Sequence, residues 1–416
     1  MKVLLSDGSG LTARQSANRL AEAGHVVHAL APDRLCLCRF TRHVARIHHV
    51  PPYGSDPLRW LEAAVATYRA GRFDVLLPTQ EQVAVLSVAA DELRDQGVAT
   101  VVPPFASLVA VQDKVSAWAT LERLGIPQPA GAIRPDGWTA FPAFVKKPIG
   151  TASGGVRRVT SREELERAMG GNPALIQAGV DGPLAMCQAV FDSGRLVAFH
   201  ANERTGEGAN GGASYKRSIE AVEIRRWFEV LGSGLRWHGA LSADVILGPD
   251  GPLFIDVNPR LVEPENAWRS GVDLIGPMLE LARGAHPAGQ PPSRQGTATH
   301  QLLLAVLGAA QHGRGRRGVA AELVRAWTRT GPYRGSIEEL TPSTHDPVAA
   351  VPVVMAGAAT LAMPRAWSWF AAGSVGSYAL TTEGWQRVLD EADRLQLLVP
   401  RRPVGGRSRS GAVPPK

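Results

Sequence analysis

The residues of this sequence best suited to chemistry lie in a short stretch that ends at Arg260. Residues 241–247 and 252–257 are apolar runs separated by Gly-Pro-Asp-Gly, a pattern that predicts two strands joined by a tight turn. Pairing of these strands would bring Asp244 and Asp256 close together. The sequence therefore predicts a β-hairpin that holds two carboxylates on adjacent strands.

This hairpin would present three oxygen ligands on one wall. Asn258 lies two residues after Asp256, so both side chains leave the same face of the strand. Two carboxylates and an amide oxygen suit Mg²⁺, which completes its shell with water and substrate phosphates. Arg260 falls at the next same-face position and offers a planar donor for phosphate or carboxylate, which makes it a catalytic candidate. Taken alone, Asp and Asn at a strand end also form turns, so this interpretation depends on the rest of the chain.

A second group of candidates surrounds a glycine-rich loop. Lys147 ends a strand predicted at residues 141–147, from which a lysine can reach phosphate oxygens while the backbone N–H groups of the loop line the other side. Because side chains alternate along a strand, only one of Lys146 and Lys147 can point inward, and we expect it to be Lys147. The loop adds the candidates Ser153, Gly154 and Gly155.

Two further segments carry weaker signals. Lys114 opens a predicted helix directly after Asp113. Gln177, Ala178 and Gly179 end a predicted strand, where exposed backbone groups could contact the edge of an adenine ring. Neither segment would indicate a nucleotide site by itself.

Several folded units must position these residues, because 416 residues exceed what one hydrophobic core supports. The chain opens with a strand, a helix and a second strand, and further buried strands at 74–78 and 98–102 predict a small doubly wound α/β domain. Residues 203–214 are polar and contain four glycines, so we expect a mobile loop there.

Composition argues against nucleic acid and membrane partners. The formal charge of +7 falls to +2 without the Arg-rich residues 400–416, a tail that we expect to be disordered. The longest apolar run, residues 349–363, is shorter than the roughly 20 residues of a spanning helix and is expected to be a buried element. The wider apolar region 349–370 is expected to be core or a homodimer face. Three cysteines do not make a disulfide framework, which favours a cytoplasmic protein.

Taken together and in this order, the segments resemble the ATP-grasp superfamily, in particular its carboxylate–amine ligases that are similar to the carbamoyl-phosphate synthase large subunit. The resemblance spans about residues 74–283 and rests on Asp113-Lys114, Leu124-Gly125-Ile126-Pro127, Phe144-Val145-Lys146-Lys147-Pro148, Ser153-Gly154-Gly155-Val156, Gln177, Asp244 and Asp256-Val257-Asn258-Pro259-Arg260. The chain departs from the family where Pro183 and Leu184 replace an acid that commonly binds ribose.

The resemblance implies an α/β and α+β architecture. An N-terminal doubly wound parallel-sheet domain (1–105) would precede an ATP-grasp fold of two α+β subdomains, one with the glycine-rich loop (106–180) and one with the metal site (181–285). A C-terminal α+β extension (286–399) would then lead to the basic tail.

The resemblance also implies roles for the candidates. ATP would lie between the two subdomains, with Lys114 and Lys147 on its phosphates and residues 177–179 on adenine. Asp244, Asp256 and Asn258 would hold one or two Mg²⁺ ions, with Mn²⁺ as an alternative. Arg204, Lys216, Glu263 and Glu265 are weaker substrate-binding candidates, and the two acids would either receive a cationic amine or form a solvated loop.

The implied function is that of an ADP-forming ligase. A small-molecule carboxylate would take the γ-phosphoryl group, and an amine would attack the acylphosphate to form an amide or peptide bond. Two alternatives stay open at this point: an ATP-dependent carboxylase that activates bicarbonate, and a non-catalytic nucleotide-binding scaffold.

Overall fold

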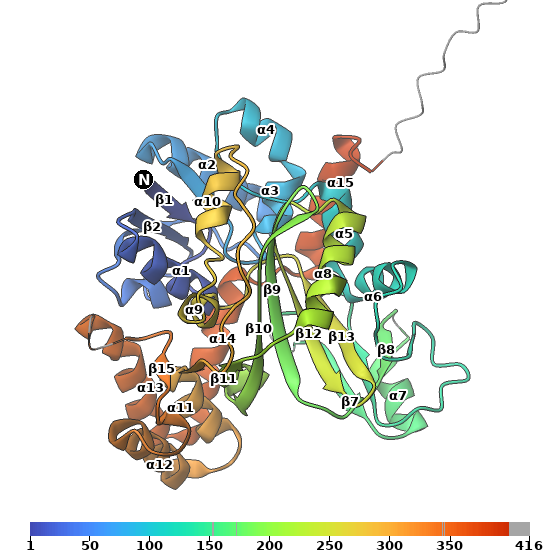
Figure 1. Cartoon of the computed structure of the whole chain (residues 1–416), viewed down its shortest axis with the longest axis vertical. Coiled ribbons are helices and arrows are strands. Elements are labelled where there is room, and N and C mark those ends of the chain that lie inside the picture. Colours follow the sequence, from blue (N-terminus) through green and yellow to red (C-terminus); the bar gives the residue numbers. More distant parts are fainter. Residues whose placement is uncertain (152–153, 172, 343, 345, 399–416) are drawn as a thin grey trace, which may run out of the picture.

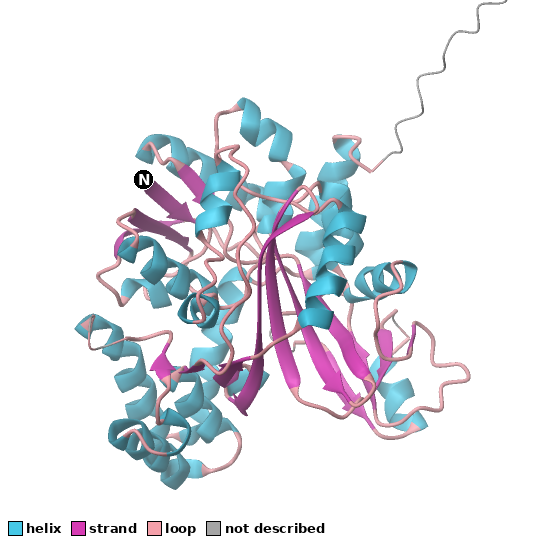
Figure 2. Cartoon of the chain, in the orientation of Figure 1, coloured by secondary structure: helices cyan, strands magenta, loops and turns pink. Residues whose placement is uncertain are grey.

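The computed structural model describes residues 1–151, 154–171, 173–342, 344 and 346–398. Its described strands form three sheets, which Figure 2 shows surrounded by helices. In Figure 1 the N-terminal unit lies at the upper left, the helices α11, α12 and α13 at the lower left, and the remaining sheets at the centre and right. The fold class predicted from the sequence, a parallel-sheet domain followed by α+β units, is confirmed.

The N-terminal unit is a parallel four-stranded sheet with the order β3-β2-β1-β4. Its strands and helices are β1 (Lys2–Leu5), α1 (Leu11–Glu22), β2 (Val26–Ala31), β3 (Val44–His49), α2 (Pro57–Gly71), β4 (Val75–Leu77), α3 (Val83–Val88), α4 (Ala90–Asp95) and α5 (Phe105–Gln112). The strand expected at 98–102 was wrong, because that segment is irregular. The fourth strand is β3, whose mixed polar sequence reflects a partly exposed edge position.

A second, antiparallel sheet has the order β5-β8-β6-β7. Its strands and the neighbouring helices are α6 (Lys114–Arg123), β5 (Gly131–Ala132), β6 (Ala143–Lys146), β7 (Val156–Val159), α7 (Arg162–Met169) and β8 (Leu175–Ala178). Helix α7 begins where Ser161 accepts a hydrogen bond from the Glu164 N–H, as its capping-box sequence indicates. Leu165 of α7 packs with Val145 and Ile176 of the sheet, which fixes the strand that leads into the glycine-rich loop.

The largest sheet is seven-stranded and has the order β13-β12-β9-β10-β11-β14-β15. Its strands and the helix on its face are β9 (Leu184–Asp192), β10 (Arg195–Glu207), β11 (Ala213–Ser218), α8 (Val222–Leu235), β12 (Gly239–Gly248), β13 (Gly251–Asn258), β14 (Ala298–His300) and β15 (Ile337–Glu338). Phe228 and Leu231 of α8 are buried against Phe254 and Leu241. The loop expected at 203–214 is shorter than predicted, because β10 continues to Glu207 and β11 starts at Ala213.

The C-terminal segment is distributed over the other units. Strands β14 and β15 join the large sheet, and the helices are α11 (Leu302–Gln311), α12 (Gly315–Thr328), α13 (Ala350–Ala362), α14 (Trp367–Tyr378) and α15 (Thr382–Arg394). Helix α15 returns to the N-terminal unit, where Trp385 packs 6.1 Å from Phe105, measured between ring centroids. The residues after 285 therefore do not form a separate body. The division of the chain at 105, 180 and 285 remains a proposal. In the described part of the chain, no helix is both long and apolar enough to cross a membrane.

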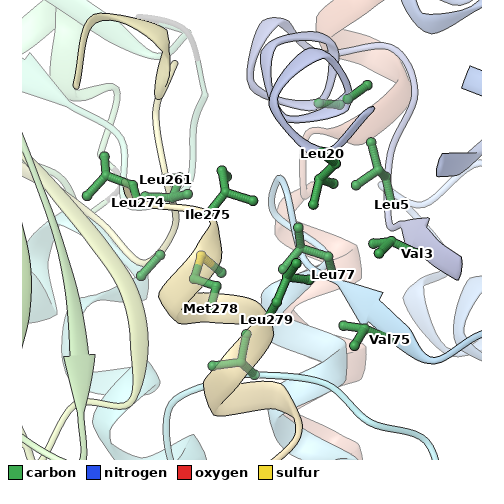
Figure 3. Packing of buried hydrophobic residues seen from close by; sticks show 14 of the residues in the cluster. Val3, Leu5, Leu20, Val75, Leu77, Leu261, Leu274, Ile275, Met278 and Leu279 are labelled. Atoms are coloured by element: carbon green, nitrogen blue, oxygen red, sulfur yellow. The ribbon is translucent and has the colours of Figure 1, made fainter. Parts of the chain in front are cut away.

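Helices α9 (Glu265–Arg269) and α10 (Gly276–Ala282) join the N-terminal sheet to the large sheet. Figure 3 shows Met278 and Leu279 of α10 facing Leu77 and Val75 of β4. Burial of each such side chain contributes about 1.5–3 kcal/mol. This core sets the N-terminal unit beside the end of β13, where Arg260 lies.

Candidate functional site

One cavity of about 790 Å³ lies among all of these units. This volume is near the upper end of the roughly 300–1,000 Å³ that is typical of ligand sites, so the cavity has room for more than one small molecule. The sequence-predicted residues that line it are Lys114, Gln177, Ala178, Arg204, Asp244, Asp256, Asn258, Arg260 and Glu263. Those that do not line it are Lys147, Gly154, Gly155, Gly179, Lys216 and Glu265. Ser153 lies outside the described residues.

The predicted hairpin is present as β12 and β13. Asp244 pairs directly with Asp256, and Ser242 pairs with Asn258, so both carboxylates and the amide reach one wall of the cavity. Burial, reinforced by the nearby charge of Asp256, raises the pKa of Asp244 to about 6. A cation bound between the two carboxylates would remove this repulsion.

The composition of the wall bears on metal binding. Among the residues that the structure describes, no group of three or more His, Cys, Asp or Glu side chains could hold a metal ion. The hairpin instead offers two carboxylates and one amide oxygen. This incomplete hard-oxygen set suits Mg²⁺ or Mn²⁺, which takes its remaining ligands from water and phosphate.

Lys114 is the first residue of α6 and approaches the carboxylates of the hairpin from that helix. Asp113 caps that helix by accepting hydrogen bonds from the N–H groups of Val115 and Ser116 at 3.0 and 2.9 Å. The cap directs Lys114 toward the hairpin, where its Nζ lies 3.0 Å from both carboxylate oxygens of Asp256. The ammonium group is thus held against the Asp256 carboxylate of the hairpin.

The inward lysine of β6 is Lys146, so the expectation that Lys147 points inward was wrong. Lys146 is 6% exposed and lines the cavity, whereas Lys147 is exposed to solvent. The Nζ of Lys146 donates to the Oε1 of Gln177 at 2.7 Å and to the carbonyl of Ile255 at 2.6 Å. An ammonium group has three N–H donors, so one remains for an anion. Burial lowers the pKa of Lys146 to about 8, although the Asp256 charge opposes this shift.

The expected adenine-binding backbone is largely engaged within the protein. The N–H of Ala178 donates to Ala130 at 2.9 Å, and that of Gly179 donates to Pro142 at 2.7 Å. Gln177 and Ala178 line the cavity, but Gly179 does not. Gly154 and Gly155 are exposed and likewise lie outside the lining, whereas Gly150 and Thr151 of the same loop belong to it. The sequence therefore located both segments, and Gln177 and Ala178 are the predicted positions within them that reach the cavity.

Arg260 is held by a residue that sequence reasoning missed. Its Nε lies 3.1 Å from Oε1 of Glu81, which also accepts a hydrogen bond from the Thr151 hydroxyl at 3.3 Å. Glu81 follows Thr79 and Gln80 directly after the buried strand β4. Polar residues at the carboxyl end of a parallel strand are a recognised signal for a site, and this signal could have identified Glu81.

Two of the weaker substrate candidates, Lys216 and Glu263, belong to an internal ion network. Glu263 and Glu265 are both buried, so the alternative that the two acids form a solvated loop was wrong. Lys216, 1% exposed, is paired with Glu263 and lies 2.6 Å from Oε2 of Glu339. Burial alone would lower the pKa of Lys216, but the two carboxylates outweigh burial and raise it. Glu263 reaches the cavity lining while keeping this partner.

Glu265 and Arg204 have separate partners. Glu265 is buried at the start of α9, 2.7 Å from Arg19 and 2.8 Å from Arg269, and burial raises its pKa to about 7. Arg204 lines the cavity while donating to the carbonyl of Gly211 at 2.7 Å. Among these four candidates, only Arg204 and Glu263 reach the lining of the cavity.

Comparisons with known proteins place this geometry in context. A family model described as an ATP-grasp domain matches residues 111–264, the segment that contains Lys114, Lys146, the hairpin and Arg260. No protein with a curated function matches the sequence.

Solved structures share the fold at low sequence identity. Biotin carboxylase from Campylobacter jejuni, described as a complex with beta-gamma-ATP, matches with a TM-score of 0.57 and 16% identity over 71% of this chain and 74% of its own. The biotin carboxylase domain of 2-oxoglutarate carboxylase from Hydrogenobacter thermophilus, solved with MgADP and bicarbonate, has a TM-score of 0.56 and 17% identity over 71% of this chain and 73% of its own. An L-amino acid ligase from Bacillus licheniformis has a TM-score of 0.53 and 16% identity over 69% of this chain and 75% of its own.

Proposed function

We propose that this protein is an ADP-forming ligase that joins a small-molecule carboxylate to an amine, and the match of residues 111–264 to the ATP-grasp family model supports this proposal. The single observation that carries the proposal is the composition of one cavity wall. Two lysines, an arginine, two carboxylates and an amide from different elements line the same space. These groups match the charges of a metal–triphosphate and of a carboxylate that accepts a phosphoryl group.

In this proposal, the two lysines bind phosphate oxygens. Lys146 is fixed by Gln177 and Ile255 and keeps one donor, while Lys114 leaves Asp256 when a phosphate replaces that carboxylate as its partner. Asp244, Asp256 and Asn258 would hold Mg²⁺, which would supply charge neutralisation for the triphosphate. Adenine lies toward β6 and β8, where Phe144 and Ala178 line the cavity.

Arg260 is the proposed catalytic residue. Its guanidinium is held by Glu81 beside the hairpin and offers planar donors to the transferred phosphoryl group and to the substrate carboxylate. A carboxylate oxygen attacks the γ-phosphorus, and the bond to the bridging oxygen breaks with its electron pair leaving on ADP. The amine nitrogen then attacks the acyl carbon, phosphate leaves, and the nitrogen loses a proton. Positioning and charge stabilisation account for most of the rate in such transfers.

A carboxylase is the second candidate, because two of the similar solved structures are biotin carboxylases, one of them solved with bicarbonate. Bicarbonate would occupy the same position as the substrate carboxylate and yield carboxyphosphate. It contains no apolar group, however, whereas much of this cavity is apolar. A non-catalytic scaffold is the third alternative.

Release of ADP separates the three candidates. Purified protein is incubated with Mg-ATP and pools of carboxylic acids and amines, with and without bicarbonate. The ligase predicts ADP release that needs both an acid and an amine. Release that needs bicarbonate instead would select the carboxylase, and no release under any condition would select the scaffold. Arg260→Met should abolish release while leaving Mg-ATP binding within a few-fold of the parent.

A further inference from the structure

The cavity extends well beyond the ATP-grasp domain into a region with a different character. Beyond Arg260 its lining comes from α11, α13, α14 and the N-terminal segment 33–40. The side chains here are large and apolar: Leu304, Leu307, Phe40, Phe370, Met355 and Trp369. We call these six residues, together with Leu35, the apolar lobe.

Several residues of the apolar lobe are exposed despite their size. Leu35 is 70% exposed, Met355 is 48% exposed and Trp369 is 68% exposed, yet all three line the same cavity. Single exposed apolar residues are ordinary, but a cluster of them at the rim of a cavity marks a binding surface. Covering this accessible apolar area with an apolar ligand is energetically favourable, because it removes the area from water.

The apolar lobe is separate from the proposed adenine position. Adenine would lie against β6 and β8, whereas the lobe is built by α11, α13 and α14. In Figure 1, α11 and α13 lie at the lower left and β7 and β8 at the lower right, with the strands of the large sheet between them. A nucleotide in the ATP-grasp domain therefore leaves the lobe available for a second molecule.

We propose that the apolar lobe binds the hydrocarbon body of the carboxylate substrate, which is an acid with a bulky aromatic or long aliphatic group. This inference rests on the proposed ligase function. The carboxylate end must reach Arg260 and the γ-phosphate, because the phosphoryl group is transferred there. The rest of the acid then extends toward Met355 and Trp369, the exposed surface that continues the same cavity. Bicarbonate or acetate would leave this surface uncovered.

Binding of a graded series of acids tests the lobe without catalysis. Acetate, hexanoate and 3-phenylpropanoate share one charge and differ in apolar size, and their dissociation constants can be measured by ligand-observed NMR without nucleotide. We expect 3-phenylpropanoate to bind at least tenfold tighter than acetate. Trp369→Ala and Met355→Asp should each weaken 3-phenylpropanoate at least fivefold, because each removes apolar contact area from the lobe.

Matched controls are available on neighbouring helices. Trp327 of α12 is 89% exposed and Val354 of α13 is 65% exposed, and neither lines the cavity. Trp327→Ala and Val354→Asp should leave binding of 3-phenylpropanoate within twofold of the parent. Equal affinity for all three acids, or an equal effect of Trp327→Ala and Trp369→Ala, would overturn the assignment of the lobe.

Turnover separates the lobe from the ligase function. Hydroxylamine attacks acylphosphates to give a hydroxamate and phosphate, so it can replace the unidentified amine in reactions with Mg-ATP and the same three acids. Hydroxamate yields that increase from acetate to 3-phenylpropanoate would support both proposals. Size-selective binding without ADP release would retain the lobe and refute the ligase. ADP release with all three acids alike, without size-selective binding, would retain the ligase and refute the lobe.

Discussion

Lys114 Nζ lies 3.0 Å from both carboxylate oxygens of Asp256, so the proposed phosphate-binding lysine and a proposed metal ligand share one contact. A lysine and a divalent ion compete for the same carboxylate. Mg-ATP would resolve this competition, because the metal takes the carboxylate while the lysine turns to phosphate. The protein alone should therefore bind metal weakly, and nucleotide and metal should bind cooperatively.

Lys114→Met should change the affinities for metal and for nucleotide in opposite directions. Without its competitor, Asp256 becomes available, so Mn²⁺ alone should bind several-fold tighter than to the parent. ATP should bind about tenfold more weakly, because one charge-assisted hydrogen bond is lost. Electron paramagnetic resonance titration of Mn²⁺ and calorimetric titration of ATP measure the two affinities. Weaker Mn²⁺ binding in the variant would contradict the competition.

The hairpin could be predicted because two independent patterns agree. Alternation along two apolar runs and a turn rich in Gly, Pro and Asp together fix which residues pair, and Asp244 does lie opposite Asp256. Short elements offered less information. Strand β6 is only four residues long, so its apolar pattern did not determine whether Lys146 or Lys147 faces the cavity.

The rest of the cavity depends on contacts between distant segments. Glu263 and Glu265 read as a solvated acidic loop, but Lys216 and Arg19 come from elsewhere in the chain and bury them. The apolar lobe likewise combines residues near 35 with residues near 355 and 369. No local pattern encodes that combination, because it arises from how the units pack.

Lys146→Met should remove most of the nucleotide-dependent turnover. The substitution keeps the length of the side chain and removes the charge that we place on the phosphates, so we expect a loss of about 10²–10³-fold in kcat/KM. Lys147→Met is the matched control, because Lys147 is adjacent but exposed, and it should retain activity within threefold. Equal losses in the two variants, measured as ADP release, would restore Lys147 as the phosphate ligand.

Asp244→Asn should stabilise the metal-free protein in a pH-dependent manner. Folding raises the pKa of Asp244 from 3.8 to about 6, so its ionisation costs stability as the pH rises through this window, and the full cost is present above it. At pH 8 the variant should be about 1–3 kcal/mol more stable than the parent, and at pH 4 the two should be equal. Urea unfolding in EDTA measures the difference. An equal difference in the free energy of unfolding between variant and parent at both pH values would show that ionisation of Asp244 does not destabilise the fold.

Lys216→Met should destabilise the fold strongly. The substitution leaves Glu263 and Glu339 buried without their shared cation, and loss of one partner from a buried ion pair costs about 3–5 kcal/mol. Arg217→Met, at the next and exposed position, should change the free energy of unfolding by less than about 0.5 kcal/mol. Urea unfolding at pH 7 compares the two variants. A loss below about 1 kcal/mol for Lys216→Met would mean that the network is not structural.

Isotope transfer tests the central claim most directly. The acid that gives the highest turnover is labelled with ¹⁸O in both carboxylate oxygens and incubated with Mg-ATP and a nucleophile, and the phosphate released is analysed by mass spectrometry. Transfer of the γ-phosphoryl group to the carboxylate predicts one ¹⁸O in each phosphate, because the attacking oxygen leaves with phosphorus. Release of ADP with unlabelled phosphate would contradict the acylphosphate route.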